Sequence, residues 1–352
     1  MQGIEKKKKR SSEIDFVIAW VDMNDPEWRA AKTRYDATAS VKDTENSAAR
    51  YRDWGTLRYW FRAVEKYAPW VHKIWFVTAG SVPAWLNVNH EKLKIVRHED
   101  YIPSEYLPTF SSHPIELNFF RIQGLAEQFV YFNDDMFLMR PAVPEDFFMD
   151  GLPCDEALLS IHCPLESKII HTIAANDAGV INEHFTMRDV LKQGTKKWFH
   201  PVYGIKNLLQ NLILSKCPRF PGFKQFHCPA PLLKSVCQAV WDNDSSPAFT
   251  STHKFREKLD INQWVFREWA IAEGKFVPYP VHRKARFVAF DQMTYETALK
   301  KLKAVFADPE CIMACINDFD HEGDDFDLDR AIHDVQQLFE QRLFEKSGYE
   351  WD

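Results

Sequence analysis

The chain has 352 residues, of which 45% are hydrophobic and 14% aromatic, so it can bury a sizeable core in one elaborated domain or two. A net charge of −6 argues against a general nucleic-acid-binding protein, because contacts to phosphates require a basic face. No apolar run approaches the roughly 18 residues of a membrane span, and the seven cysteines include no CxxC pair, so we expect a cytoplasmic protein with reduced thiols.

Residues 1–12 include a basic cluster at 6–10 and lack hydrophobic periodicity. We expect a solvated, flexible tail, since runs of like charge repel one another and stay hydrated. The alternative is peripheral contact with an anionic membrane, where each basic residue near the surface contributes about 1 kcal/mol.

Residues 14–21 form a nearly continuous apolar run, which is typical of a strand buried on both faces. The run ends at Asp22, and the turn residues Asn24 and Asp25 follow. Because ligands of open α/β sheets bind beyond the carboxyl ends of the strands, Asp22 is a candidate substrate-binding residue. The polar residues 29–47 are expected to form a loop over this site.

Arg50 and Arg52 precede a predicted helix whose apolar residues recur at helical spacing over residues 57–68. A helix N-terminus favours anions and guanidinium groups bind phosphate oxygens in pairs, so both arginines are candidate phosphate ligands. The alternative is surface charge paired with Asp53. Strands predicted at 73–78 and 93–96 follow, and this alternation indicates a parallel sheet.

Another helix is predicted to begin near Pro114, with a buried apolar stripe over residues 115–125. Glu116 and Arg121 lie off this stripe. We therefore expect both side chains to face the site at the carboxyl edge of the sheet.

The apolar run 129–132 ends in Asn133, Asp134 and Asp135. Two adjacent carboxylates repel each other, so a partly buried pair attracts a cation. Hard oxygen ligands suit Mg²⁺ or Mn²⁺, and either ion can hold a diphosphate. The alternative is an Asx-rich turn after a strand, with no role in binding.

A series of short segments recurs in order through the first part of the chain: WVD at 20–22, RYRD at 50–53, KYAPW at 66–70, VPAWL at 82–86, LPTF at 107–110, IE at 115–116 and YFNDD at 131–135. Together these segments resemble the first two blocks of the Stealth family of sugar-1-phosphate transferases. This family includes bacterial capsule and exopolysaccharide phosphotransferases and the α/β subunit of the animal lysosomal-enzyme N-acetylglucosamine-1-phosphotransferase. The resemblance runs in four blocks through nearly the whole chain after the tail, and an ordered match of this length is more specific than any single motif.

The segment 226–235 resembles the third block, in which two prolines hold His227 on a stiff stretch of chain. A histidine titrates near neutrality, so His227 is a candidate base for an attacking hydroxyl, the alternative being a packing residue. The resemblance implies that Arg256 neutralises phosphates, whereas without it Arg256 equally fits a salt bridge at a helix edge. Lys234 and Gln263 are assigned to substrate binding.

The strand predicted at 311–316 ends in Asn317 and Asp318 and resembles the fourth block, so both are candidate metal ligands beside Asp134 and Asp135. Residues 318–329 half-match a calcium-binding loop but lack its final Glu. We favour a solvated acidic loop there.

We expect an α/β protein with a Rossmann-like, GT-A-like nucleotide-sugar core and a mainly parallel sheet. Residues 13–150 would form the nucleotide-sugar and metal-binding core, and residues 151–280 a large, mostly helical lobe inserted on the acceptor side. Residues 281–352 would complete the core.

The resemblance implies transfer of a sugar-1-phosphate from a UDP-sugar to a hydroxyl of a polysaccharide or lipid-linked glycan, with release of UMP. Phosphoryl transfer of this kind needs a metal on carboxylates, arginines around the phosphates and a positioned base. The alternatives are a metal-dependent glycosyltransferase that releases UDP, and a non-catalytic glycan-binding protein. The candidate catalytic residues are Glu116, Asp135, His227 and Arg256, with either Glu116 or His227 as the base.

Overall fold

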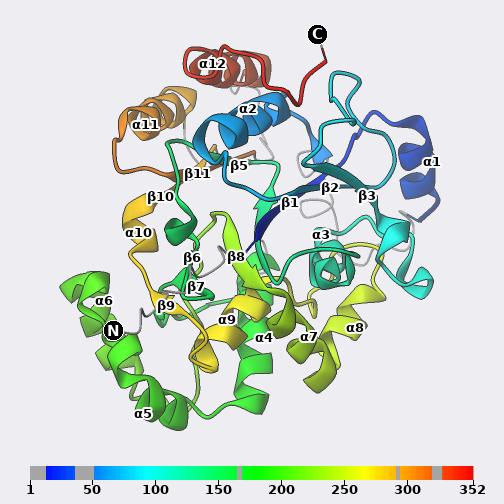
Figure 1. Ribbon diagram of the computed structural model, residues 1–352. Helices are drawn as coiled ribbons and strands as arrows, with labels where there is room; N and C mark the ends of the chain where they lie inside the picture. The colour runs from blue at the N-terminus through cyan, green and yellow to red at the C-terminus, as the bar shows by residue number, and fades with distance from the viewer. Residues whose placement is uncertain (1–12, 36–50, 165–168, 291–293, 319–326, 352) are drawn as a thin grey trace, which may run out of the picture.

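A five-stranded sheet forms the centre of the computed structural model, which describes residues 13–35, 51–164, 169–290, 294–318 and 327–351 (Figure 1). Its strand order is β3-β2-β1-β4-β8; the first four strands are parallel, and β8 runs antiparallel to β4. The predicted α/β fold with a mainly parallel sheet is therefore confirmed. The strands are β1 (Ile14–Trp20), β2 (Ile74–Thr78), β3 (Leu93–Arg97), β4 (Gln128–Asn133) and β8 (Ala230–Leu233).

Two smaller sheets accompany the central one. In the order β10-β11-β5, β11 is parallel to β10 and antiparallel to β5, and the remaining sheet has the order β6-β7-β9. Only Asp134 and Asp135 separate β4 from β5, so the chain passes from the central sheet to the second one within a single turn. The bounds are Met136–Leu138 for β5, Phe148–Met149 for β6, Leu152–Asp155 for β7, Val277–Pro278 for β9, Ala285–Ala289 for β10 and Met313–Asn317 for β11.

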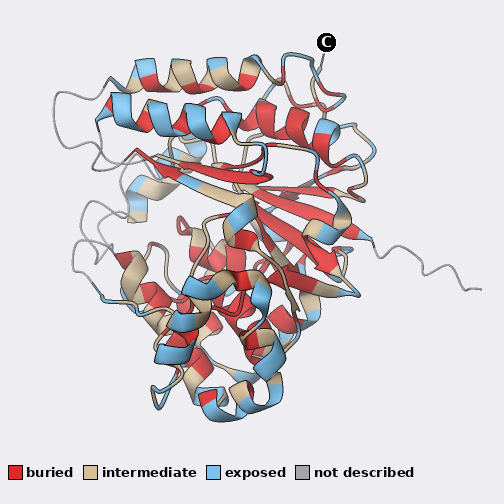
Figure 2. Ribbon diagram, turned by 90° about the vertical axis from the view of Figure 1, so that its left-hand side faces the viewer, coloured by how far each residue is buried: buried red, intermediate tan, exposed pale blue. Residues whose placement is uncertain are grey.

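Helices cover the sheets from two sides. Helices α2, α11 and α12 lie on one side, and α3 to α9 lie on the other, where they form a lower lobe (Figures 1 and 2). The segment 151–280 contains α4 to α9, and it also supplies strand β8 to the central sheet. The bounds are Pro26–Tyr35 for α1, Leu57–Tyr67 for α2, Ser112–Leu117 for α3, Ile169–His184 for α4, Met187–Trp198 for α5, Gly204–Leu214 for α6, Lys234–Asn243 for α7, Ser246–Ser251 for α8, Trp264–Ala272 for α9, Val281–Lys284 for α10, Tyr295–Ala307 for α11 and Leu328–Glu340 for α12.

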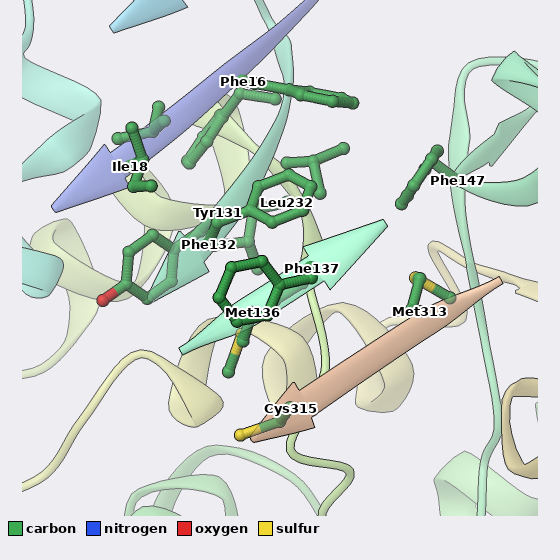
Figure 3. Close-up of a cluster of buried hydrophobic side chains, with 14 of the residues drawn as sticks. Phe16, Ile18, Tyr131, Phe132, Met136, Phe137, Phe147, Leu232, Met313 and Cys315 are labelled. Atoms are coloured by element: carbon green, nitrogen blue, oxygen red, sulfur yellow. The ribbon is translucent and has the colours of Figure 1, made fainter. Parts of the chain in front are cut away.

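The hydrophobic core is continuous between the central sheet and the second sheet. Phe16 and Phe132 from the central sheet lie near Phe137 and Met313 from the second sheet in the same buried cluster (Figure 3). The rings of Phe16 and Phe132 are 4.9 Å apart, a separation typical of favourable aromatic pairs. Because both sheets contribute to one core, the turn between β4 and β5 is held from both ends.

Two sequence-based expectations about local structure were wrong. The stretch 29–47 was expected to be a loop, but α1 extends to Tyr35, and residues 36–50 lie outside the described residues. The carboxylate of Asp25 accepts hydrogen bonds from the backbone N–H groups of Glu27 and Trp28, and Pro26 occupies the first helical position, so this helix has a capped start.

The helix predicted over residues 115–125 is also shorter than expected. Helix α3 ends at Leu117, and a single 3-10 turn, Phe119–Arg121, follows. The side-chain amide of Asn118 donates to the carbonyl of Pro114 at 2.8 Å, and Gly124 adopts a positive φ of 85°, which is not helical. No helix in the described part of the chain is long and apolar enough to cross a membrane.

Candidate functional site

Acidic side chains gather at the carboxyl edge of the central sheet. Strands β1 and β4 are parallel neighbours, and their register places Ala19 opposite Asn133. The residues that follow these strands, Asp22 after β1 and Asp134 after β4, therefore leave the sheet at the same edge. The sequence-based expectation of acids at strand ends is met for these two positions.

Asp135 is fixed by the end of strand β11. Its Oδ2 accepts a hydrogen bond from the Nδ2 of Asn317 at 2.8 Å and a weaker one from the thiol of Cys315 at 3.2 Å. Its Oδ1 is buried and has no hydrogen-bond partner among the residues that the structure describes. A buried carboxylate oxygen without a donor is costly, so it favours a bound cation or a proton there.

Asp134 lies in a strongly negative environment. Burial, followed by the charges of Asp135, Asp53 and Asp318, raises its pKa to about 8. Asp53 is partly exposed to solvent. Partial burial of its carboxyl group and the charge of Asp22 raise its pKa as well. Carboxyl groups whose pKa values are raised by burial and by neighbouring carboxylates mark a place where positive charge is stabilised.

A salt bridge joins the N-terminal and C-terminal parts of the site. Nη1 of Arg52 lies 2.9 Å from Oδ2 and 3.2 Å from Oδ1 of Asp318, so the guanidinium contacts both carboxylate oxygens. These residues are 266 positions apart in the sequence. Arg52 is thereby placed beside the acids, where its charge offsets part of theirs. Arg50 lies outside the described residues.

The described side chains supply the oxygen donors that Mg²⁺ or Mn²⁺ prefers, and Asp135 has an unsatisfied buried oxygen. No group of three or more His, Cys, Asp or Glu side chains within the described ranges is already arranged around a metal position. The chemistry of the donors therefore fits a hard divalent cation, and their convergence would require an adjustment of side chains.

Glu116 is connected to the acidic edge through Tyr131. The hydroxyl of Tyr131 donates to Oε1 of Glu116 at 3.1 Å and also contacts the side chain of Asn133, the residue before Asp134. Burial raises the pKa of Glu116, whereas the charges of His113 and Arg256 act in the opposite direction.

Arg256 approaches the same network from the lower lobe. Its Nη2 donates to the Oγ of Ser112 at 3.2 Å, at the start of α3, the helix that contains Glu116. Arg256 therefore lies close to the helix that contains Glu116, and its charge acts on Glu116. The chemical roles of both residues stay predictions.

His227 lies against the second sheet. Its ring centroid is 4.7 Å from that of Phe287 and 5.4 Å from that of Trp264. Phe287 pairs in the strand ladder with Cys315, whose thiol donates to Asp135. His227 therefore contacts β10, the neighbour of the strand whose Cys315 and Asn317 bond Asp135. Its role as base stays a prediction.

Gln263 is the residue before Trp264 at the start of α9, and it is buried. Its Oε1 has no hydrogen-bond partner in the described part of the chain. The next residue, Trp264, contacts His227, and the role of Gln263 in substrate binding stays a prediction.

Lys234 is far from the acids, and its predicted role in substrate binding is not supported. Strand β8 runs antiparallel to β4, and Leu233 pairs with Gln128, the first residue of β4. Lys234 is thus at the amino end of β4, roughly 20 Å from Asp134 at a rise of ~3.3 Å per residue. Its Nζ points to the carbonyls of the segment 122–125 instead.

Arg121 also has contacts other than those predicted. Its guanidinium lies over the rings of Phe120 and Trp241, at 4.7 Å and 4.6 Å from their centroids, and its Nε donates to Asn118. This cation–π packing joins the 3-10 turn to α7.

Most of the calcium-like loop 318–329 lies outside the described residues, and Asp327 caps the start of α12.

Sequence reasoning missed two features of the site. Asp53 was weighed only as an ion-pair partner, although it stands beside the candidate phosphate ligand Arg52. Asp260 accepts hydrogen bonds from Nδ1 of His113 at 2.9 Å and from Nδ1 of His253 at 2.6 Å, which fixes both imidazoles. The charge of His113 acts on Glu116. No spacing rule connects residues 113 and 260, so only the fold reveals this arrangement.

The sequence matches family models and several known proteins. Residues 12–39 match the model of Stealth protein conserved region 1, and residues 50–154 match that of conserved region 2. The capsular polysaccharide phosphotransferase WcwK of Streptococcus pneumoniae is 38% identical over 347 residues, which cover 97% of this chain and 99% of the relative. The receptor polysaccharide phosphotransferase WefC of Streptococcus oralis is 43% identical over 268 residues, or 75% of this chain and 80% of the relative.

Among solved structures, the galactosyltransferase LgtC in complex with donor and acceptor sugar analogues has a TM-score of 0.41 and 9% sequence identity, and the match covers 93% of this chain and 95% of the other. The family membership follows from the sequence relatives, which align with this chain over almost its full length. The chain therefore belongs to the Stealth family and contains its conserved regions 1 and 2.

Proposed function

We propose that this protein transfers a sugar-1-phosphate from a UDP-sugar to a hydroxyl of a growing glycan, releasing UMP. The observation that supports this most is the meeting of Asp134 and Asp135 with the Arg52–Asp318 salt bridge at one edge of the sheet. The names of the relatives agree, since they are polysaccharide phosphotransferases. A free polysaccharide or a lipid-linked glycan would serve as acceptor, and the cytoplasm would be the compartment.

In the proposed reaction, the acceptor oxygen forms a bond to the phosphorus that bears the sugar. The bond from this phosphorus to the bridging oxygen of the diphosphate breaks, and its electron pair leaves with UMP. The proton of the acceptor hydroxyl passes to Glu116 or His227. Arginine is suited to the diphosphate because its planar guanidinium binds two oxygens at once, and we assign Arg52 and Arg256 to this role.

We assign the cation to Asp134 and Asp135, with Asn317 and Asp318 as further oxygen donors. A bound Mg²⁺ or Mn²⁺ would neutralise negative charge on the diphosphate oxygens. The unpaired Oδ1 of Asp135 supports this assignment, because a buried carboxylate oxygen with no donor is stable only near positive charge or a proton. Asp22, at the same edge, is assigned to the nucleotide sugar.

Glu116 and His227 both remain candidates for the base. Burial raises the pKa of Glu116 toward the range in which a carboxylate accepts protons effectively at neutral pH. His227 is the alternative base, because histidine is the side chain that most often accepts a proton in enzymes. Single variants Glu116→Gln and His227→Asn, measured over a range of pH, separate the two, because loss of the base removes the acidic limb of the profile of kcat/KM.

The products decide between this proposal and a glycosyltransferase. The protein is incubated with Mg²⁺, a glycan acceptor and each of several UDP-sugars, and the released nucleotide is identified by chromatography. UMP supports sugar-1-phosphate transfer, whereas UDP means that attack occurs at the anomeric carbon and contradicts the proposal. A glycan-binding protein would release neither nucleotide.

Asp135→Asn tests the metal assignment, with Asp242→Asn on the surface of α7 as the matched control. We expect Asp135→Asn to abolish UMP release and Asp242→Asn to leave it unchanged. Mg²⁺ should raise the melting temperature of the wild type and of Asp242→Asn, but not that of Asp135→Asn. An equal Mg²⁺-dependent increase in all three proteins would contradict the assignment, whatever their activities.

A further inference from the structure

Helix α6 presents an apolar face to solvent. Ile205 is 79% exposed, Leu209 54%, Leu212 51% and Ile213 69%. At ~100° per residue, these four side chains project within an arc of roughly 100° on one side of the helix. Large aliphatic side chains clustered in this way mark an interaction surface more often than isolated exposed ones do.

The opposite side of α6 anchors the helix to the protein. Asn211 is buried there; its side chain accepts from the N–H of Leu159 at 2.8 Å and donates to the carbonyls of Ala157 and Trp198 at 2.8 Å and 2.9 Å. The exposed apolar arc is therefore held pointing outward by specific hydrogen bonds. In Figure 1, α6 lies at the outer edge of the lower lobe, on the side that Figure 2 turns toward the viewer.

Basic residues are concentrated in the stretch of sequence that contains α6, in contrast to the net charge of −6 of the whole chain. Between residues 187 and 224, Asp189 is the only acidic residue. The basic residues of the segment that are exposed in the structure are Arg188, Lys192, Lys196, Lys206, Lys216 and Arg219. Lys206 borders the apolar arc on α6 itself, and Lys216 and Arg219 follow the end of the helix.

We propose that α6 docks this protein on the surface of an anionic lipid bilayer. The aliphatic arc would enter the boundary between headgroups and acyl chains, and the surrounding lysines and arginines would contact anionic headgroups. A protein partner fits less well, because a stable protein–protein interface takes about 20 residues per side, whereas the arc has four. The proposal does not rest on the reaction assigned above, and vesicle binding would remain if the product assay failed.

Co-sedimentation of the full chain with vesicles tests the proposal. One set of vesicles contains phosphatidylcholine alone, and the other contains equal parts of phosphatidylcholine and phosphatidylglycerol. We expect binding to the anionic vesicles, and binding that weakens as salt concentration rises, because the headgroup contacts are screened. The double variant Leu209→Gln/Ile213→Gln should bind about a hundredfold more weakly, at roughly tenfold per aliphatic side chain withheld from the bilayer.

Two further variants make the test specific. Leu259→Gln replaces a leucine that is 67% exposed outside α6 and should bind vesicles like the wild type. Lys206→Glu/Lys216→Glu keeps the aliphatic arc and should weaken binding to the anionic vesicles alone. All these positions are exposed, so circular dichroism should show unchanged melting temperatures.

Several outcomes would overturn the proposal. One is an absence of vesicle binding by the wild type, and another is equal binding by wild type and Leu209→Gln/Ile213→Gln. Binding that is abolished by replacing residues 6–10 with Gln, while the α6 variant still binds, would assign the contact to the N-terminal residues. A concentration-dependent dimer in ultracentrifugation that the α6 variant loses, without vesicle binding, would make the arc a protein interface.

Discussion

Replacing Tyr131 by Phe removes a single oxygen from the centre of the candidate site. The residue is 1% exposed, and its hydroxyl lies between Glu116 and Asn133. A hydroxyl has one hydrogen, so it can donate to only one of these two partners. We infer that it donates to Glu116 and that Asn133 presents its amide N–H₂ to the Tyr131 oxygen, since the two ends of an amide have nearly the same shape.

The expected loss of stability follows from these contacts. Tyr131→Phe leaves the buried carboxyl of Glu116 without one donor, and a hydrogen bond to a charged group contributes about 1.5–3 kcal/mol. We therefore expect the free energy of unfolding to fall by about 2 kcal/mol, or roughly 30-fold in the unfolding equilibrium constant. Urea denaturation followed by tryptophan fluorescence measures this difference.

The loss should depend on pH. Burial raises the pKa of Glu116 above its unfolded value, so the folded state binds the proton more tightly and loses stability as pH rises through the folded pKa. Without the Tyr131 donor, this pKa rises further. The stability difference between the variant and the wild type should therefore be larger at neutral pH than near the ordinary carboxyl pKa. If Glu116 is the base, the acidic limb of the pH–rate profile should also move to higher pH.

A double-mutant cycle with Glu116→Gln completes the test. If the two side chains interact as described, the effects of the single variants on stability should not add, with an interaction energy of about 1 kcal/mol or more. Strict additivity, or a stability loss in Tyr131→Phe that is the same at both pH values, would refute the inferred hydrogen bond to Glu116.

Lys234→Ala should change the KM for the proposed UDP-sugar donor by less than about twofold, because Lys234 lies at the amino end of β4. A tenfold rise in KM would mean instead that Lys234 contributes to substrate binding. Glu268→Gln should stabilise the protein, and more so as pH rises. Glu268 and Asp177 are fully buried, and burial raises the pKa of both carboxyl groups. The charge of Glu268 raises the pKa of Asp177 further. The folded protein therefore loses stability as these carboxyl groups ionise. Thermal melts over a range of pH would contradict this if the variant melted at or below the wild type at alkaline pH.

Strands β1, β2 and β4 could be predicted from the sequence because each is a short apolar run that is almost entirely buried. The positions of Asp22 and Asp134 followed from this pattern, since parallel strands end at the same edge. The clustering of Glu116 with Arg256 was accessible only through family resemblance. Periodicity alone does not indicate that residues separated by 140 positions meet.

The direction of β8 could not be predicted from the sequence. A short apolar run has no intrinsic direction in a sheet, and the antiparallel pairing with β4 moves Lys234 to the far edge. The end of α3 could not be predicted either, because the apolar spacing continues beyond Leu117. At this end the side chain of Asn118 bonds the carbonyl of Pro114. Asp53 was overlooked because its neighbour Arg52 offered a simple ion-pair explanation, whereas the structure pairs Arg52 with Asp318.

Asp134 and Asp135 are the only residues between β4 and β5, so their positions depend on both the central sheet and the second sheet. A change in how these sheets pack would be transmitted directly to the carboxylates, since no loop absorbs the shift. Shortening Phe137, a buried residue of β5 whose ring lies 4.6 Å from Phe339, would thus disturb the acids without touching them. A substitution deep in this core can therefore change the positions of the two carboxylates as well as the stability of the fold.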